Sequence, residues 1–305
     1  MQKEIKVLDR GFVRLVDSMG DDSSIVQAAR VSYGKGTKKT SEDEALIRYL
    51  LRNKHTTPFE MVEFKFHIKA PIFVFRQWHR HRMWSYNEYS GRYSEMKDEF
   101  YSPTDSLFTK QNPTNKQGGT NEAIPWNDFR SDYRSWEEQF RNQQARARQD
   151  YEVYLATGVR KELARINLPL SQYSEMYAKV DLHNLFHFLK LRMDAHAQYE
   201  IRVYGDAIAE IVKNVVPIAY KAFEDYILGS TTFNFKELKS IYLIFDIFRS
   251  SRPVDKEWWE QDDIQSLVEK EANRVFSNKR EREEFLQKVL PLFVYEFGNK
   301  KFPGA

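Results

Sequence analysis

Three arginines, Arg80, Arg82 and Arg92, lie within thirteen residues of the chain, and one carboxylate, Glu88, lies among them. Each guanidinium presents a planar fork of N–H donors that matches the oxygens of a phosphate group. Aromatic side chains alternate with these arginines along residues 77–93, and aromatic rings stack on flat ring systems. The segment therefore favours a binding site for a nucleotide, and a solvated basic loop is the alternative.

Arg192 is a second candidate for binding an anion. It follows Phe188 and Leu189 at the helical spacings of four and three, so it lies beside an apolar helix face. Arginine keeps its proton in proteins, so a buried guanidinium needs an anionic partner. Two interpretations stay open: an ion pair with Asp194 or Glu200, or a site for an anionic ligand.

A pair of histidines, His183 and His187, is spaced by four residues, and His196 follows further along the chain. Two histidines one helical turn apart can bind a metal ion, which would suit a metal-dependent nucleotide hydrolase. No carboxylate or third ligand stands at a set spacing from this pair, so packing at a surface or against a cofactor is favoured. The sequence therefore predicts no metal site.

Several motifs of the chain are similar to those of one enzyme family. Arg80-His81-Arg82, followed after seven residues by Ser90, matches the signature of flavin-dependent thymidylate synthases, and the surrounding N-E-x-S-G-R-Y of residues 87–93 is typical of the same family. Five further segments match the family and occur in the family's order along the chain: 25–32, 55–60, 70–78, 164–170 and 191–200. The resemblance extends from about residue 5 to about residue 228.

This resemblance implies an enzyme that converts dUMP, 5,10-methylenetetrahydrofolate and NADPH to dTMP, tetrahydrofolate and NADP+. One FAD binds tightly to each subunit, is reduced by NADPH and supplies the hydride that completes the methyl group. The family builds each site from several chains, so a homotetramer with shared sites is expected. The chain contains no cysteine, so it cannot attack the uracil ring with a thiolate, as the other route to thymidylate does.

By the same resemblance Arg192 is the catalytic residue, whose guanidinium stabilises a uracil ring that has lost its N3 proton. The dUMP is expected to contact one set of residues: Gln77, Trp78, His79, Arg80, Glu88, Tyr89, Ser90, Gly91, Arg92, Arg165 and Arg192. The FAD is expected to contact a second set: Ser32, Thr57, Arg80, His81, Arg82, Glu88, Asp181, Leu182, His183 and His187. Many relatives have asparagine in place of Asp181 and His187, and arginine in place of His183.

The 305 residues carry a formal net charge of +3, with an isoelectric point of about 8.7. This mild positive charge suits small anionic partners and does not by itself imply nucleic-acid binding. A module that binds RNA or DNA through the arginine and aromatic segment is a rival interpretation. No apolar run is long enough to span a membrane and no apolar stretch marks a signal peptide, so a cytoplasmic protein is expected.

The strands and helices expected from the sequence must position these residues. Together they indicate an α+β fold, in which a small antiparallel or mixed sheet packs with long helices. Alternating apolar and polar residues predict a strand over 61–68, and a capping box at Ser41 and Glu44 predicts the start of a helix. Further strands are expected at 5–8, 12–16 and 170–177, and further helices at 23–30, 71–78, 128–156, near 161, 182–193 and 197–225.

Two domains are expected. Residues 1–228 carry all the site motifs, and residues 229–305 are predicted to form a helical extension. Within the first domain, residues 109–127 are polar, with two prolines and two glycines. This composition predicts a mobile loop or lid, with a dispensable surface insertion as the alternative.

Overall fold

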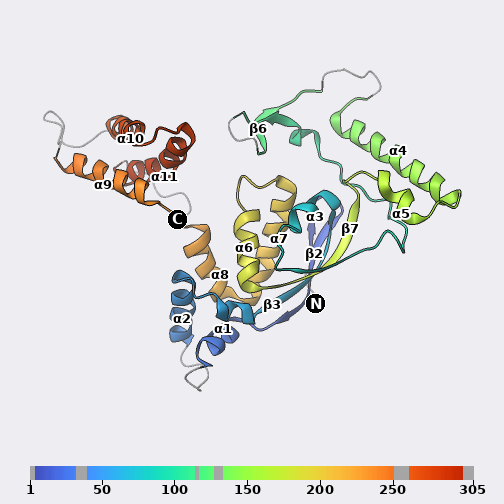
Figure 1. The fold of residues 1–305 in the computed structure, drawn as a ribbon, viewed down its shortest axis with the longest axis horizontal. Helices are drawn as coiled ribbons and strands as arrows, with labels where there is room; N and C mark the ends of the chain where they lie inside the picture. Colours follow the sequence, from blue (N-terminus) through green and yellow to red (C-terminus); the bar gives the residue numbers. More distant parts are fainter. Residues whose placement is uncertain (1–3, 32–39, 114–116, 127–132, 251–260, 298–305) are drawn as a thin grey trace. The chain divides into compact units, whose positions relative to one another are not determined.

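The computed structural model of the protein describes residues 4–31, 40–113, 117–126, 133–250 and 261–297. The chain divides into two compact units, residues 1–229 and 230–305 (Figure 1). The first unit contains the sheets and most of the helices, and the described part of the second unit is built from helices.

A five-stranded antiparallel sheet with the strand order β1-β2-β3-β7-β4 forms the centre of the first unit. Its strands are β1 (Glu4–Val7), β2 (Gly11–Met19), β3 (Glu63–Pro71), β4 (Ser85–Glu88) and β7 (Tyr173–Asp181). The predicted α+β fold is confirmed, and the strand pairs of this sheet are antiparallel rather than mixed. The alternation expected in β3 is present, because Phe64, Phe66 and Ile68 are fully buried while Lys65 is exposed.

Helices cover the apolar face of this sheet, and one continuous core joins them to it. They are α1 (Asp22–Ala29), α2 (Thr40–Arg52), α3 (Ile72–Trp78), α6 (Leu182–Arg192), α7 (Tyr199–Val215) and α8 (Pro217–Phe223), with the short turns η2 (Thr57–Met61) and η5 (Glu224–Leu228). In Figure 1, α6 and α7 lie side by side next to the strands. Burial of this apolar surface is the main force that stabilises the unit. The opposite face carries polar side chains, including Lys65 and His67.

The helix expected over residues 197–225 is interrupted in the structure. It ends as α7 at Val215, and Pro217 occupies the first turn of α8. Proline lacks the backbone N–H that would continue the preceding helix, but it is well suited to begin a new one. The prediction of one long helix was therefore wrong at this proline.

The polar segment predicted as a loop contains a small hairpin, formed by β5 (Thr109–Gln111) and β6 (Gly119–Ala123). Aromatic rings pack beside the hairpin: Phe108 stacks on Trp136 with ring centroids 5.5 Å apart, and Trp126 meets Trp136 edge-on at 4.7 Å. Trp136 is the first residue of α4 (Trp136–Ala156), which therefore begins later than the predicted residue 128. The prediction missed this packing because two of the three rings lie outside the polar segment.

Helix α4, together with α5 (Lys161–Ala164), holds the segment that follows residues 77–93, the arginine motif. The Arg148 Nη1 atom donates to the backbone carbonyl of Met96 at 2.6 Å, and the backbone N–H of Met96 donates to the Tyr151 hydroxyl at 2.9 Å. Met96 and Tyr151 are buried together in a small apolar cluster. The course of this segment is thus fixed by α4 as well as by the sheet.

The second unit contains α9 (Phe235–Ser250), α10 (Gln261–Val275) and α11 (Lys279–Phe297). Apolar side chains from the three helices form its core, including Ile244, Val268 and Phe285, which are fully buried. A buried carboxylate, Glu237, is paired with Lys288 at 2.6 Å, which offsets the cost of its burial. In the described part of either unit, no helix combines the length and the apolar character needed to cross a membrane.

Candidate functional site

Arg192 and His81 meet where two helices end. Helix α3 ends at Trp78, shortly before His81, and α6 ends at Arg192 itself. The Arg192 Nε–H donates to His81 Nε2 at 2.9 Å, and an Nη2–H donates to the backbone carbonyl of Gln77 at 3.3 Å. The C-terminal end of a helix carries partial negative charge, so both helix ends favour a cation at this position.

The Arg192 guanidinium has no carboxylate partner among the described residues. Asp194 instead pairs with His196 at 2.8 Å, and Glu200 accepts a hydrogen bond from the Tyr101 hydroxyl at 3.2 Å. The ion pair that the sequence left open is therefore absent from the described part of the chain. Burial lowers the pKa of Arg192 below its usual value, so this desolvated cation would be stabilised by an anionic ligand.

His81 acts in this pair as a neutral acceptor. Its side chain is buried, with 8% of the residue exposed. Burial, and then the nearby charges of Arg192 and His187, lower the pKa of His81 to about 4. At neutral pH the Nε2 atom therefore carries a lone pair toward Arg192, and the ring proton is on Nδ1.

Aromatic rings pack around the pair and hold the turn that carries it. The Trp78 ring is fully buried and stacks on Phe188 with centroids 4.8 Å apart. The Tyr86 hydroxyl donates to the backbone carbonyl of His81 at 2.9 Å and also lies 3.2 Å from the backbone carbonyl of Trp78. Because the Trp78 ring is buried, the predicted contact of this residue with a nucleotide can involve only its backbone.

The segment expected to contact the nucleotide, residues 88–92, begins at the last residue of β4. Glu88 ends this strand, and its carboxylate accepts a hydrogen bond from the Ser174 hydroxyl of β7 at 2.9 Å. The Tyr89 hydroxyl donates to the backbone carbonyl of Glu95 at 2.7 Å, which closes the following loop. Within that loop, the Ser90 hydroxyl accepts a hydrogen bond from a backbone N–H two residues on at 3.3 Å. Ser90 is therefore held in a turn beside two arginines.

These two arginines, Arg92 and Arg165, approach the segment from different sides. The Arg92 Nε–H donates to Glu162 at 3.0 Å, in a pair that is largely exposed to solvent. Gly91 is buried, and a Cβ atom at this position would lie 2.9 Å from Cδ of Arg165. The absence of a side chain at Gly91 thus allows the Arg165 side chain to lie against the backbone of the loop.

The remaining members of the motif are more open. Arg80 and Arg82 are exposed, and the described residues offer neither side chain a hydrogen bond or ion pair. The His79 ring meets Tyr86 edge-on at 4.8 Å. The Gln77 side-chain amide donates to Gln198 at 2.5 Å, at the start of α7. Two unpaired, exposed guanidiniums suit the phosphates of a ligand.

Comparison with known proteins identifies the family. Residues 14–218 match the family described as thymidylate synthase complementing protein, Thy1. The flavin-dependent thymidylate synthase of Treponema denticola is 54% identical over 241 residues, which are 79% of this chain and 89% of that protein. The chain belongs to the Thy1 family of flavin-dependent thymidylate synthases. It is thus a methyltransferase that uses a flavin to make thymidylate, as its resemblance predicted.

Two further relatives extend this comparison. A flavin-dependent thymidylate synthase of Thermus thermophilus is 55% identical over 237 residues, which are 78% of this chain and 84% of that protein. Among solved structures, a UMP/dUMP methylase from Streptomyces cacaoi, bound with 5-Br dUMP, superposes with a TM-score of 0.63 at 31% identity. That alignment covers 73% of this chain and 98% of the methylase.

Four of the ten residues expected to hold the flavin of this thymidylate synthase lie at the start of α6 or along it. Asp181 caps the helix, and its carboxylate accepts a hydrogen bond at 2.9 Å from the backbone N–H three residues on. Leu182 is fully buried and so offers no side chain to a ligand. His183 is half-buried and His187 is exposed, and the His187 ring lies 5.9 Å from the His81 ring. His81 therefore contacts both Arg192 and a histidine of the expected flavin set.

Two other expected flavin contacts lie elsewhere. Thr57 is exposed at the first position of η2, and Ser32 lies outside the described residues. The unpaired Arg80 and Arg82 fit the pyrophosphate of FAD, so the residues present are suited to this cofactor. In the described ranges, no group of three or more histidine, aspartate or glutamate side chains is placed to hold a metal ion.

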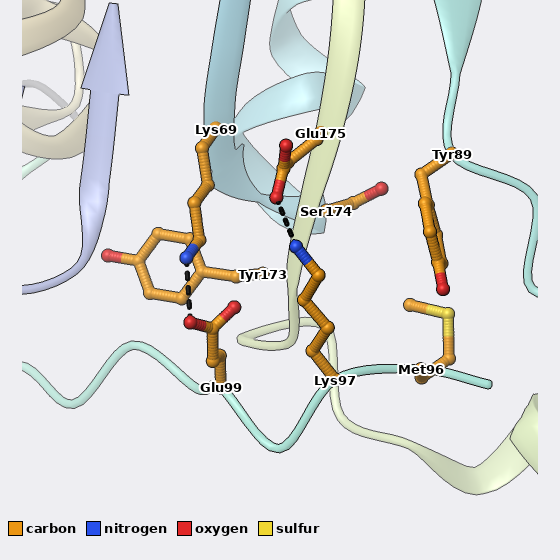
Figure 2. A pocket seen from close by; sticks show the side chains of 8 residues that line it. All are labelled: Lys69, Tyr89, Met96, Lys97, Glu99, Tyr173, Ser174 and Glu175. Carbon is orange, nitrogen blue, oxygen red and sulfur yellow. Dashed lines mark hydrogen bonds and ion pairs between the residues drawn. The ribbon is translucent and has the colours of Figure 1, made fainter. Parts of the chain in front are cut away.

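A small cavity lies beside the nucleotide segment, between β3, β7 and the loop that ends at Glu99 (Figure 2). Lys69 of β3 pairs with Glu99 at 2.7 Å, and Lys97 pairs with Glu175 of β7 at 2.6 Å. Each lysine in the cavity is thus matched by a carboxylate, which leaves no excess positive charge for an anion. The two ion pairs instead tie the loop to the sheet.

Several residues that support the site were not predicted from the sequence. Tyr86 lies inside the arginine motif, and the aromatic-rich composition of that segment is the one local signal that could have found it. Ser174, Glu162 and Gln198 contact motif residues that are 86, 70 and 121 positions away along the chain. No local pattern reports contacts of that range.

Proposed function

We propose that the enzyme methylates dUMP at C5 of its pyrimidine ring, with 5,10-methylenetetrahydrofolate as the carbon donor and NADPH as the reductant. Bound FAD, once reduced, would supply the hydride that completes the methyl group. The Streptomyces cacaoi relative, crystallised with 5-Br dUMP, supports a pyrimidine nucleotide as the substrate. The chain has no cysteine, so its ring chemistry must proceed without a thiolate adduct.

The unpaired charge of Arg192 is the observation that carries this proposal. A half-buried guanidinium without a carboxylate partner in the described chain is suited to an anion that forms during the reaction. A uracil ring that has lost its N3 proton is such an anion, and its C5 atom is richer in electrons than that of the neutral ring. The cation is already in place, so it stabilises this charge without reorganisation.

The expected dUMP set also supplies a place for the nucleotide phosphate. Arg165 lies against Gly91, and Arg92 lies one residue further along the same loop. Arg92 is held by Glu162 in a largely exposed pair, which contributes little stability and can be exchanged for a phosphate contact. The Ser90 hydroxyl adds a donor in the same turn.

We further propose a homotetramer whose sites are shared between subunits. Arg80 and Glu88 are expected to contact both ligands, and one short segment can hardly enclose dUMP and FAD alone. The exposed, unpaired side chains of Arg80 and Arg82 are consistent with a ligand or subunit that covers them. Cytoplasmic location remains a prediction from the sequence.

The test compares Arg192→Ala with Arg146→Ala, a matched loss of an exposed arginine on α4. Flavin absorbance of the purified variants reports cofactor binding, and formation of dTMP from dUMP reports turnover. Arg192→Ala should retain flavin but lose roughly 100-fold or more in turnover, as for other fixed groups that stabilise developing charge. Arg192→Lys should recover only part of the rate, because lysine lacks the planar fork. Near-normal turnover in Arg192→Ala would remove the proposed role.

A further inference from the structure

The contacts of Arg192 leave only one edge of its guanidinium open to a ligand. A guanidinium has two edges that can present parallel N–H donors: Nε with Nη2, and Nη1 with Nη2. In this chain Nε donates to His81 Nε2 at 2.9 Å and Nη2 donates to the Gln77 carbonyl at 3.3 Å. The first edge is therefore occupied by the protein, whereas Nη1 on the second edge makes no hydrogen bond to the described residues.

His81 is itself firmly held, so it can impose this orientation. Its backbone N–H donates to the Trp78 carbonyl at 2.9 Å, and its own carbonyl accepts from the Tyr86 hydroxyl at 2.9 Å. The imidazole ring packs edge-on against Phe188 with centroids 4.9 Å apart. Backbone and ring are thus fixed independently, and Nε2 has one direction in which to accept.

We propose that His81 is a positioning residue, which fixes the guanidinium plane of Arg192 so that its Nη1–Nη2 edge faces the pyrimidine ring of dUMP. This inference rests on the proposed role of Arg192. Two parallel N–H groups of that edge match adjacent acceptors of a deprotonated ring, namely N3 and one neighbouring carbonyl oxygen. A guanidinium plane that rotated about the Cδ–Nε bond or tilted would lose this match.

The arrangement requires a neutral His81, because a protonated ring would have no lone pair for the Arg192 N–H and would repel the guanidinium. Burial and the charges of Arg192 and His187 keep His81 neutral, with a pKa of about 4. His81 therefore contributes as an acceptor under ordinary conditions and needs no proton transfer for this role.

Two amide substitutions separate this role from general packing. The side chain of His81→Gln reaches about as far as Nε2 and keeps an acceptor for Arg192. The side chain of His81→Asn reaches only the Nδ1 position and leaves Arg192 without that acceptor. Both variants stay polar and uncharged, so they differ mainly in the position of the acceptor.

We expect the glutamine variant to lose clearly less than the asparagine variant in dTMP formation and in dUMP affinity, measured by the change in flavin absorbance. The asparagine variant should lose about ten-fold or more in turnover and in dUMP affinity. A loss of this size lies within the range of interaction energies found between contacting residues. Equal behaviour of the two variants in an active enzyme would overturn the positioning role. Loss of flavin from both variants would also overturn it, because the lost activity would then follow from the missing cofactor and not from the orientation of Arg192.

A double-mutant cycle supplies the second measurement. In the Arg192→Ala background, His81→Asn should change dUMP affinity by less than about two-fold, because the residue through which it acts is gone. Additive losses in the double variant would contradict the inference. Failure of the proposed function itself would be recognised separately, by the absence of dTMP formation in the wild-type enzyme.

Discussion

Removal of the Tyr86 hydroxyl tests whether the arginine motif is held by its own backbone contacts. The hydroxyl donates to the His81 carbonyl at 2.9 Å, and also lies 3.2 Å from the Trp78 carbonyl. The Trp78 carbonyl keeps a second donor, the backbone N–H of His81, but the His81 carbonyl accepts from no other described group. Tyr86→Phe should therefore leave one half-buried carbonyl unsatisfied, which costs about 1–3 kcal/mol of unfolding free energy.

The measurement is urea unfolding of Tyr86→Phe beside a matched control, Tyr89→Phe. The Tyr89 hydroxyl also donates to a backbone carbonyl, that of Glu95 at 2.7 Å, but this contact is exposed and water can replace it. The control should stay within about 0.5 kcal/mol of the wild type. Tyr86→Phe should also lower turnover, because it loosens the turn that carries His81. Equal, small losses of stability in both variants would refute the reasoning.

Three further outcomes are expected. The folded pKa of His81, about 4, lies below its ordinary 6.5. The unfolded chain therefore takes up this proton first, and the free energy of unfolding should fall as the pH drops from 6.5 toward 4. Urea unfolding across this range should show a weaker dependence of stability on pH in His81→Gln. Gly91→Ala places a Cβ 2.7 Å from the sulfur of Met96 and 2.9 Å from Cδ of Arg165, so unfolding and dUMP titration should show a loss of about 1–3 kcal/mol in stability and weaker binding. A chain that ends at Leu228 should keep flavin and measurable dTMP formation, since the expected site residues lie in the first unit; a flavin-loaded but inactive truncation would assign the second unit a part in the site.

Local patterns in the sequence predicted the parts of the fold that depend on local physics. The alternation around Phe64 and Phe66 predicted β3, because a half-buried strand places every second side chain in the core. The family motif predicted that Arg80 and Ser90 belong to one segment. The contact between His81 and Arg192 spans 111 residues, and no periodicity reports which distant acceptor a given arginine will find.

The same limit explains the errors in element bounds. The apolar period of an amphipathic stretch continues across Pro217 while the helical backbone does not, so the pattern predicts one helix where the structure has two. The hairpin of β5 and β6 was missed because Phe108 and Trp136, which pack beside it, flank a segment that is polar by itself. In both cases the missing information was spatial. At Pro217 it was the backbone hydrogen bond that proline cannot donate, and at the hairpin it was the packing of rings that lie far apart in the sequence.

The strand order has a consequence for how the protein is made. Strand β4, which leads into the nucleotide loop, pairs in the described sheet with β7, and Ser85 lies opposite Lys179. Ribosomes add about 5–20 residues per second, so roughly 5–20 seconds separate the synthesis of these two partners. During this interval the arginine-rich segment has left the ribosome without the strand that will align it. The proposed nucleotide site would therefore be completed late in translation, and a nascent chain that stops before β7 would present its cationic residues without the strand that aligns them.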